Sequence, residues 1–165
     1  MKIFRLCNLY GLDFYHGTSN KAFILGYEGD VKNPQYSISK FGLEYPFLTS
    51  DIDMAKYYAE LTSENDGDYR SYPLVLKVKN LDESLLRLDK YSMDEPIMSS
   101  EEKRDREWDQ AAKDHPEWYD AENDLISIPE EEWGISYNAV GAVKYNGIIP
   151  FSDLEVVWEG NEKNN

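Results

Sequence analysis

The chain of 165 residues has the length of one domain, or of one domain with a sizeable insertion. It carries 17 basic and 32 acidic residues, a net charge of −15, and this argues against an electrostatic grip on nucleic acid, because phosphate binding needs cationic surface. Cys7 is the only cysteine, and the sequence has neither a signal-peptide layout nor an apolar run of about 18 residues, so we expect a soluble cytoplasmic protein without disulfides or a membrane span.

The first part of the chain predicts short strands followed by a long loop. Residues 1–19 favour one or two strands, since Phe14-Tyr15-His16 is β-prone and Gly17-Thr18-Ser19 interrupts it. We expect one helical turn over residues 20–25. Residues 26–45 are rich in Gly, Asn, Pro, Ser and Tyr without a sustained period, which predicts a loop.

A strand, a helix and a second strand follow. Phe47-Leu48-Thr49 predicts a short strand, after which Ser50 or Asp51 caps a helix. Apolar residues spaced three and four apart predict that this helix is amphipathic: Ile52, Ala55, Tyr58, Ala59. Residues 64–70 read as a polar loop. The alternation from Leu74 to Val78 predicts a half-buried strand.

One segment of the chain holds most of the negative charge. From Asp82 to Glu132 there are 18 acidic and 6 basic residues, a balance of −12, which leaves −3 for the rest. A helix is expected from Ser100, and another from Pro116 with Trp118, Ala121 and Leu125 on one stripe. An acidic run is usually a solvated helical face; a surface for a basic partner, such as an antitoxin, is the functional alternative.

The C-terminal part returns to strands, expected over residues 140–149 and 154–158, before a frayed tail at 161–165. The order strand, loop, strand, helix, strand, helical insertion, strand, strand is an α+β pattern. We therefore expect a single domain over residues 1–165, with a mostly helical acidic insertion at about 82–135.

Four features in a particular order and spacing resemble a known family. They are Tyr15-His16-Gly17-Thr18-Ser19, then Phe47-Leu48-Thr49-Ser50 leading to Ala55-Lys56-Tyr57-Tyr58-Ala59, then the strand LVLKVKNL at Leu74–Leu81, then the stretch Gly141–Pro150. Together they resemble the His-Tyr-Glu branch of the ADP-ribosyltransferases, the superfamily of diphtheria toxin and the poly(ADP-ribose) polymerases, in its bacterial and phage toxin-type members. The resemblance covers roughly residues 12–81 and 137–158. It implies split antiparallel β-sheets with short helices.

The resemblance also implies NAD as co-substrate, no metal, and roles for the residues of the first strand. In the family the matching positions bind NAD⁺, so His16 would reach a ribose hydroxyl and Gly17 would hold the nicotinamide carboxamide. A glycine suits this position because the ligand can approach its backbone N–H and C=O closely. Thr18 or Ser19 would add a hydroxyl contact. Taken alone, His16 fits a hydrogen-bonded histidine at a strand end equally well.

The helix after the second strand would supply an aromatic face for the nicotinamide ring. The Ala-x-x-Tyr-Ala match selects Tyr58, whereas an Ala-x-Tyr match selects Tyr57, and neighbouring helix positions point about 100° apart. We favour Tyr58, because it shares a face with Ala55. Thr49, in the Phe-x-Thr turn, joins the expected cofactor-binding set. A plain pair of core and rim tyrosines is the alternative.

The sequence departs from the family at the catalytic acid. The family places a glutamate on a late strand, where its charge stabilises an oxocarbenium-like transition state. Ala142 occupies the matching position, before Val143. Three explanations are open, in order of preference: a Glu-to-Ala form of a toxic enzyme, a natural pseudoenzyme, or a different register in which Asp153 or Glu155 supplies the charge.

These features lead to two functional hypotheses. The first is an NAD-dependent mono-ADP-ribosyltransferase, a glycosyltransferase used as a toxin or phage-defence effector, with protein or nucleic acid as acceptor. The second is a non-catalytic acidic binding module or pseudoenzyme on the same fold, whose surface occupies a basic partner. Binding of NAD⁺ separates the two.

Overall fold

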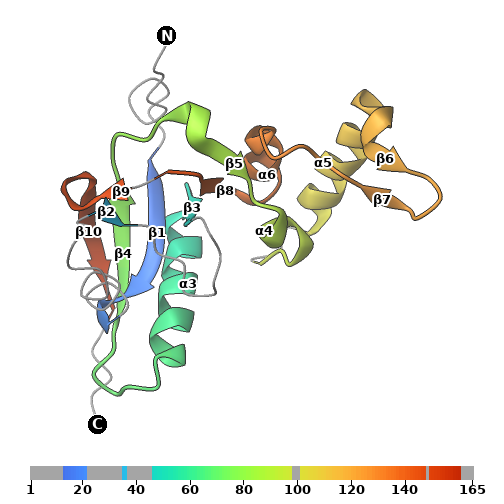
Figure 1. Cartoon of the computed structure of the whole chain (residues 1–165). Helices are drawn as coiled ribbons and strands as arrows, with labels where there is room; N and C mark the ends of the chain where they lie inside the picture. Colours follow the sequence, from blue (N-terminus) through green and yellow to red (C-terminus); the bar gives the residue numbers. More distant parts are fainter. Residues whose placement is uncertain (1–12, 22–34, 37–45, 98–100, 148, 161–165) are drawn as a thin grey trace. The chain divides into compact units, whose positions relative to one another are not determined.

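The computed structural model describes residues 13–21, 35–36, 46–97, 101–147 and 149–160 (Figure 1). It has the expected α+β architecture, with an antiparallel sheet of six strands and a few helices. The chain forms two compact units, one from residues 1–85 with 145–165 and the other from residues 86–144. Within the described part of the chain, no helix has the length and apolar character needed to cross a membrane.

The bounds of the elements are as follows. In the first unit they are β1 Phe14–Ser19, β2 Gln35–Tyr36, β3 Phe47–Thr49, α3 Ile52–Asn65, β4 Pro73–Val78, a 3₁₀ turn Glu83–Leu85, β9 Ile149–Pro150, a 3₁₀ turn Phe151–Asp153 and β10 Leu154–Glu159. In the second unit they are β5 Leu86–Leu88, α4 Lys90–Asp94, α5 Glu101–Asp114, a 3₁₀ turn Pro116–Trp118, β6 Tyr119–Asp120, β7 Leu125–Ile126, α6 Trp133–Val140 and most of β8 Ala142–Tyr145.

The sheet strands of the first unit follow the order β10-β4-β1-β3. β1 pairs with β4 over its whole length, from Phe14 opposite Val78 to Ser19 opposite Pro73. The prediction that β4 is half-buried is wrong, because successive residues are buried on both of its faces: Leu74, Val75 and Leu76.

Helix α3 covers one face of this sheet. Asp51 is its N-cap, and the Asp51 carboxylate accepts hydrogen bonds from the backbone N–H groups of Asp53 and Met54 at 2.9 and 3.4 Å. Ala55 and Ala59 are fully buried against the sheet, where they form a cluster with Val75 of β4. The amphipathic helix predicted from the spacing of apolar residues is therefore confirmed.

The second unit contains α4, α5 and α6, with β5 and β8 as neighbouring strands. The helix predicted from Ser100 is confirmed as α5 from Glu101, and it packs against α6. Asp89 is buried and caps α4, where its carboxylate accepts from the N–H and the hydroxyl of Ser92 at 3.0 and 2.7 Å. The Asp89 N–H donates to the Ser136 hydroxyl on α6 at 3.0 Å, so this buried network joins two helices of the unit.

The helix predicted from Pro116 is wrong. A short 3₁₀ turn is followed by the hairpin of β6 and β7, in which Tyr119 pairs with Ile126 and Asp120 pairs with Leu125. The ring of Trp118 stacks on His115 with centroids 3.7 Å apart. Cross-strand pairing and this stack hold the segment in an extended form that helical spacing did not reveal.

The long strand predicted over residues 140–149 is also wrong. Helix α6 runs up to Val140 and ends at Gly141, which has the left-handed conformation typical of a helix C-terminus. Only Ala142–Tyr145 and Ile149–Pro150 are strands. Within the predicted loop 26–45, Gln35–Tyr36 form β2, which pairs with β9, while the remainder of that loop, residues 22–25 and the predicted tail 161–165 lie outside the described residues.

Candidate functional site

One ring nitrogen of His16 forms a hydrogen bond, and the other is buried without a partner among the described residues. Its Nδ1 lies 2.7 Å from the carbonyl oxygen of Phe47, which accepts only, so Nδ1 carries the proton and donates. Burial lowers the pKa of His16 from 6.5, and the bond to Phe47 offsets this only in part, so the ring is neutral at pH 7. Its Nε2 is then a bare acceptor, buried, and without a hydrogen-bond partner among the described residues.

The backbone of Gly17 points away from β4. Asn20 N–H bonds Tyr72 C=O at 3.0 Å, so in the β1–β4 register the even-numbered residues of β1 exchange hydrogen bonds with β4. Bonding direction alternates along an antiparallel strand, and the N–H and C=O of Gly17 therefore face the β3 side. In the described part of the chain β1 pairs with β3 only at Tyr15 and Thr49, two residues before Gly17. Gly17 therefore turns one backbone donor and one backbone acceptor towards the β3 side.

Gly17 also permits close packing of α3. A Cβ at this position would lie 2.0 Å from the carbonyl oxygen of Ala55 and 2.8 Å from the backbone nitrogen of Ala59. Only glycine lets the helix backbone approach the strand this closely. The glycine expected to admit a ligand thus has a packing role as well, which sets the distance between α3 and β1.

The two tyrosines of α3 point in different directions. The ammonium group of Lys56 lies 5.4 Å from the ring of Trp158 on β10, so the Lys56 side of the helix faces β10. Tyr58 is two positions further and about 200° around the helix, on the flank towards β3. Tyr57 points away from the sheet, and it is 45% exposed. Their rings form a T-shaped pair with centroids 5.6 Å apart.

Helix α3 and the imidazole of His16 lie on opposite faces of β1. Side chains alternate along a strand, and α3 packs on the face of Gly17, so His16 projects to the other face. A flat ligand would meet Tyr58, the Gly17 backbone and His16 together only at the strand edge on the β3 side. We call this place, formed by His16, Gly17 and Tyr58, the β1 edge.

The two expected threonines have different surroundings. Thr18 is buried on the His16 face, and its hydroxyl, like His16 Nε2, has no hydrogen-bond partner among the described residues. Thr49 is buried in β3, and its hydroxyl accepts from the N–H of Asp51 at 3.0 Å. Thr49 therefore helps to shape the start of α3.

Ala142 begins β8 in the second unit and is buried. Its carbonyl oxygen accepts from the hydroxyl of Ser136 at 2.8 Å, and it follows the left-handed Gly141 directly. A methyl group at this position cannot provide charge.

The two alternative carboxylates are engaged where β4 meets β10. Glu155 forms an ion pair with Lys79 at 2.8 Å, and this partner lowers the pKa of Glu155. The Asp153 carboxylate accepts from the side-chain amide of Asn80 at 2.8 Å. β4 separates β10 from β1 in the sheet order, so neither group lies on the β3 side of β1.

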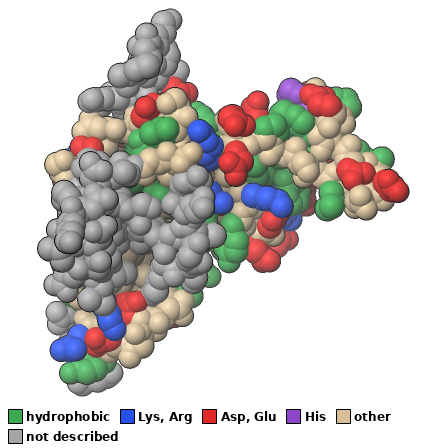
Figure 2. Space-filling model, viewed as in Figure 1, with side chains coloured by type: hydrophobic (Ala, Val, Ile, Leu, Met, Phe, Trp, Pro, Cys, Tyr) green, Lys and Arg blue, Asp and Glu red, His purple; other side chains and the backbone are tan. Residues whose placement is uncertain are grey.

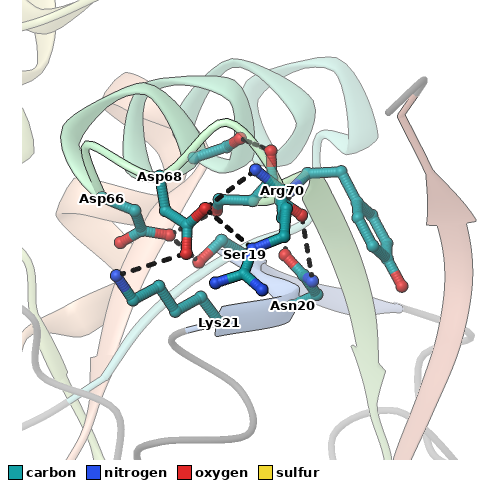
Figure 3. A network of polar contacts seen from close by, with 9 residues as sticks. Ser19, Asn20, Lys21, Asp66, Asp68 and Arg70 are labelled. Atoms are coloured by element: carbon teal, nitrogen blue, oxygen red, sulfur yellow. Dashed lines mark hydrogen bonds and ion pairs between the residues drawn. The ribbon is translucent and has the colours of Figure 1, made fainter. Parts of the chain in front are cut away.

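Sequence reasoning missed a polar network at the end of β1. Ser19 and Ser71 share the carboxylate of Asp66, although 47 residues separate Ser19 from Asp66 (Figure 3). No sequence pattern marks these partners, because a shared carboxylate between distant residues leaves no periodic signal. The described residues contain no group of three or more His, Cys, Asp or Glu side chains arranged to hold a metal ion.

Comparison with protein-family models, with curated proteins and with solved structures finds no significant match to this chain.

Proposed function

We propose that this protein is an NAD-dependent mono-ADP-ribosyltransferase of the toxin or phage-effector type. The observation that carries the proposal is the β1 edge. Here the Gly17 backbone and Tyr58 lie towards the β3 side of β1, together with a neutral His16 whose Nε2 has no hydrogen-bond partner among the described residues. This set matches the needs of nicotinamide riboside, which presents a flat ring, a carboxamide and ribose hydroxyls.

Each residue of the β1 edge has a defined task in this proposal. The carboxamide of NAD⁺ bonds to the N–H and C=O of Gly17, and the pyridinium ring stacks on Tyr58. A ribose hydroxyl donates to Nε2 of His16, and the Thr18 hydroxyl is a further partner. The bond between ribose C1′ and nicotinamide breaks with its electron pair leaving on nicotinamide, and a nucleophile on a protein or nucleic-acid acceptor then bonds C1′ and loses its proton.

The resemblance matches Ala142 to the glutamate whose charge stabilises the oxocarbenium-like transition state in the family. The proposal therefore predicts that the chain binds NAD⁺ but cleaves it slowly. In Ala142→Glu, nicotinamide release should rise by about a hundredfold to a thousandfold, the range for one electrostatic group at a reacting centre. Ala142→Gln is the matched control, since it has similar size without charge. Equal rates for both variants and for the unchanged chain would rule out an enzyme inactivated at this residue.

A second candidate function is a non-catalytic module that binds a basic partner through the acidic second unit. It is favoured by the hairpin of β6 and β7, whose residues 119–125 are all exposed and include Leu125 at 61%. Carboxylates and apolar groups stand together on this unit, as Figure 2 shows. A surface of this kind suits a partner that presents lysine or arginine around an apolar side chain.

Calorimetry with NAD⁺ distinguishes the two candidates. Binding at millimolar NAD⁺ or below, weakened in Tyr58→Ala, supports the transferase. No heat of binding at millimolar NAD⁺ favours the acidic module. The hairpin variant Leu125→Ser should leave NAD⁺ binding unchanged in either case, because it removes only an exposed side chain of the second unit.

A further inference from the structure

A shared carboxylate fastens the end of β1 to the segment between α3 and β4 (Figure 3). The hydroxyls of Ser19, the last residue of β1, and of Ser71, just before β4, both donate to Oδ2 of Asp66 at 2.5 Å. Both serines are buried, and Asp66 is the C-cap residue of α3. One carboxylate therefore ties together three elements: β1, α3 and the start of β4.

Neighbouring contacts extend this attachment by one residue. The side-chain oxygen of Asn20 accepts from the N–H of Tyr72 at 2.8 Å, and the N–H of Asn20 donates to the C=O of Tyr72 at 3.0 Å. The hydroxyl of Ser63, in the last turn of α3, donates to the C=O of Ser71 at 3.1 Å. We refer to the contacts of Asp66, Ser19 and Ser71 as the Asp66 clasp.

The Asp66 clasp acts on the same face of β1 as the contact between Gly17 and α3. Ser19 and Gly17 are two residues apart and so point to one face, about 7 Å from each other. At Gly17 the helix touches the strand backbone without an intervening side chain, so the separation of α3 and β1 depends on holding both elements in place. The clasp does this at the C-terminal end of each element.

We propose that Asp66 is a positioning residue for the β1 edge, which keeps the Gly17 backbone and the Tyr58 ring at the spacing that a stacked nicotinamide requires. The inference rests on the proposed function for its ligand. Without the clasp, β1 is still paired with β4, but its end is free to shift relative to α3. Displacement of about 1 Å at a reacting or binding group is enough to cost about a hundredfold.

The variants that test this proposal are Asp66→Ala, which removes the shared acceptor, and Asp66→Asn, which keeps one acceptor oxygen. The matched control is Asp68→Asn in the same loop. Asp68 contacts Lys21 at 3.8 Å and Arg70 at 3.4 Å through its side chain, and its backbone C=O accepts from the N–H of Ser71 at 2.9 Å, a bond that Asp68→Asn retains. Two quantities are measured on the full chain well below its unfolding temperature: NAD⁺ affinity by calorimetry, and hydrogen exchange by NMR of the Asn20 amide, which donates to the C=O of Tyr72 at the end of β1.

We expect Asp66→Ala to weaken NAD⁺ binding about tenfold to a hundredfold and to speed exchange of the Asn20 amide. Asp66→Asn should be intermediate, and Asp68→Asn should stay within about twofold of the unchanged chain. A purely structural role would lower the unfolding temperature of Asp66→Ala and leave NAD⁺ affinity and amide exchange of the folded protein unchanged, and that result would overturn the proposal.

Two further outcomes are decided by the same design. If the unchanged chain binds no NAD⁺, the proposed function fails, and amide exchange alone decides whether Asp66 positions the β1 edge. If Asp66→Ala does not fold, Ser19→Ala provides the comparison, because it removes one donor and leaves the bond from Ser71 to Asp66 in place. Unchanged exchange and affinity in Ser19→Ala would then refute the positioning role.

Discussion

Replacement of Gly17 by alanine tests the tightest contact in the first unit. The added Cβ would lie 2.0 Å from the Ala55 carbonyl oxygen, whereas real Cβ atoms essentially never come closer than 3.0 Å. The helix backbone must therefore retreat by about 1 Å, which is the difference between these two distances. Such overpacking costs typically about 1–3 kcal/mol, and a helix backbone cannot rotate away as a side chain can, so we expect about 3 kcal/mol.

Two other glycines serve as controls for Gly17→Ala. Gly134 lies in α6 with no atom within 4 Å of a new Cβ, so Gly134→Ala should stabilise the protein by up to about 1 kcal/mol through helix propensity. Gly67 also has free space but a φ of +65°, so Gly67→Ala should cost about 1 kcal/mol from backbone strain alone. Comparison of the three separates steric overlap from the general effects of glycine replacement.

The assay is urea denaturation followed by tryptophan fluorescence, with thermal melting as a second measure. A loss of about 3 kcal/mol in a chain of this size lowers the melting temperature by about 6–12 °C. An unfolding free energy of Gly17→Ala within about 0.5 kcal/mol of the unchanged chain would refute the close packing of α3 on β1. Gly17 would then have no packing role, and only its proposed role in ligand binding would remain.

Three further predictions concern His16, the tyrosines and Asp89. Burial lowers the pKa of His16, so the folded protein binds a proton there less readily than the unfolded chain does. The stability that this residue contributes is therefore full above about pH 6.5 and is lost as the pH falls towards the lowered pKa. The difference in unfolding free energy between the unchanged chain and His16→Asn should shrink on acidification. In an NMR titration, the imidazole signal that is missing in His16→Asn should titrate below pH 6.5; the other imidazole is that of His115. Tyr58→Ala should weaken NAD⁺ binding about tenfold while Tyr57→Ala changes it less than about twofold, and equal effects in calorimetry would contradict the assignment of Tyr58 to the β1 edge. Burial raises the pKa of Asp89, and Asp89→Asn keeps the cap of α4, so this variant should retain its unfolding free energy at pH 7 in urea denaturation. Asp89→Ala removes the cap and should lose about 1–2 kcal/mol. Equal losses in the two variants would show that the charge of Asp89, and not its cap, stabilises the fold.

The sequence by itself determined those helices and strands whose formation depends on residues close together in the chain. Asp51 and the spacing of Ala55 and Ala59 predicted α3, because a cap and a 3.6-residue period are properties of the segment itself. The acidic first turn of α5 was readable for the same reason. The α+β class followed from the succession of such segments.

Tertiary contacts decided what the local patterns left open. The segment after Pro116 has helical spacing, but cross-strand pairing of Tyr119 with Ile126 makes it a hairpin. Residues 133–140 contain glycine and β-prone side chains, yet they form α6, because Ser136 and Ala139 are buried in the second unit. In both cases, contacts between residues far apart or across a turn outweigh a propensity of a few tenths of a kcal/mol for each residue.

For the candidate site, the residues could be predicted from the sequence, but the directions of their side chains and backbone groups required the folded structure. His16, Gly17 and Tyr58 were selected as residue types in a recognisable order. That Tyr58 and not Tyr57 flanks the β3 side, and that Gly17 turns its backbone to that side, follows only from the helix orientation and the strand register. The Asp66 clasp had no sequence signal at all, because a hydrogen bond between distant side chains exists only once the chain is folded.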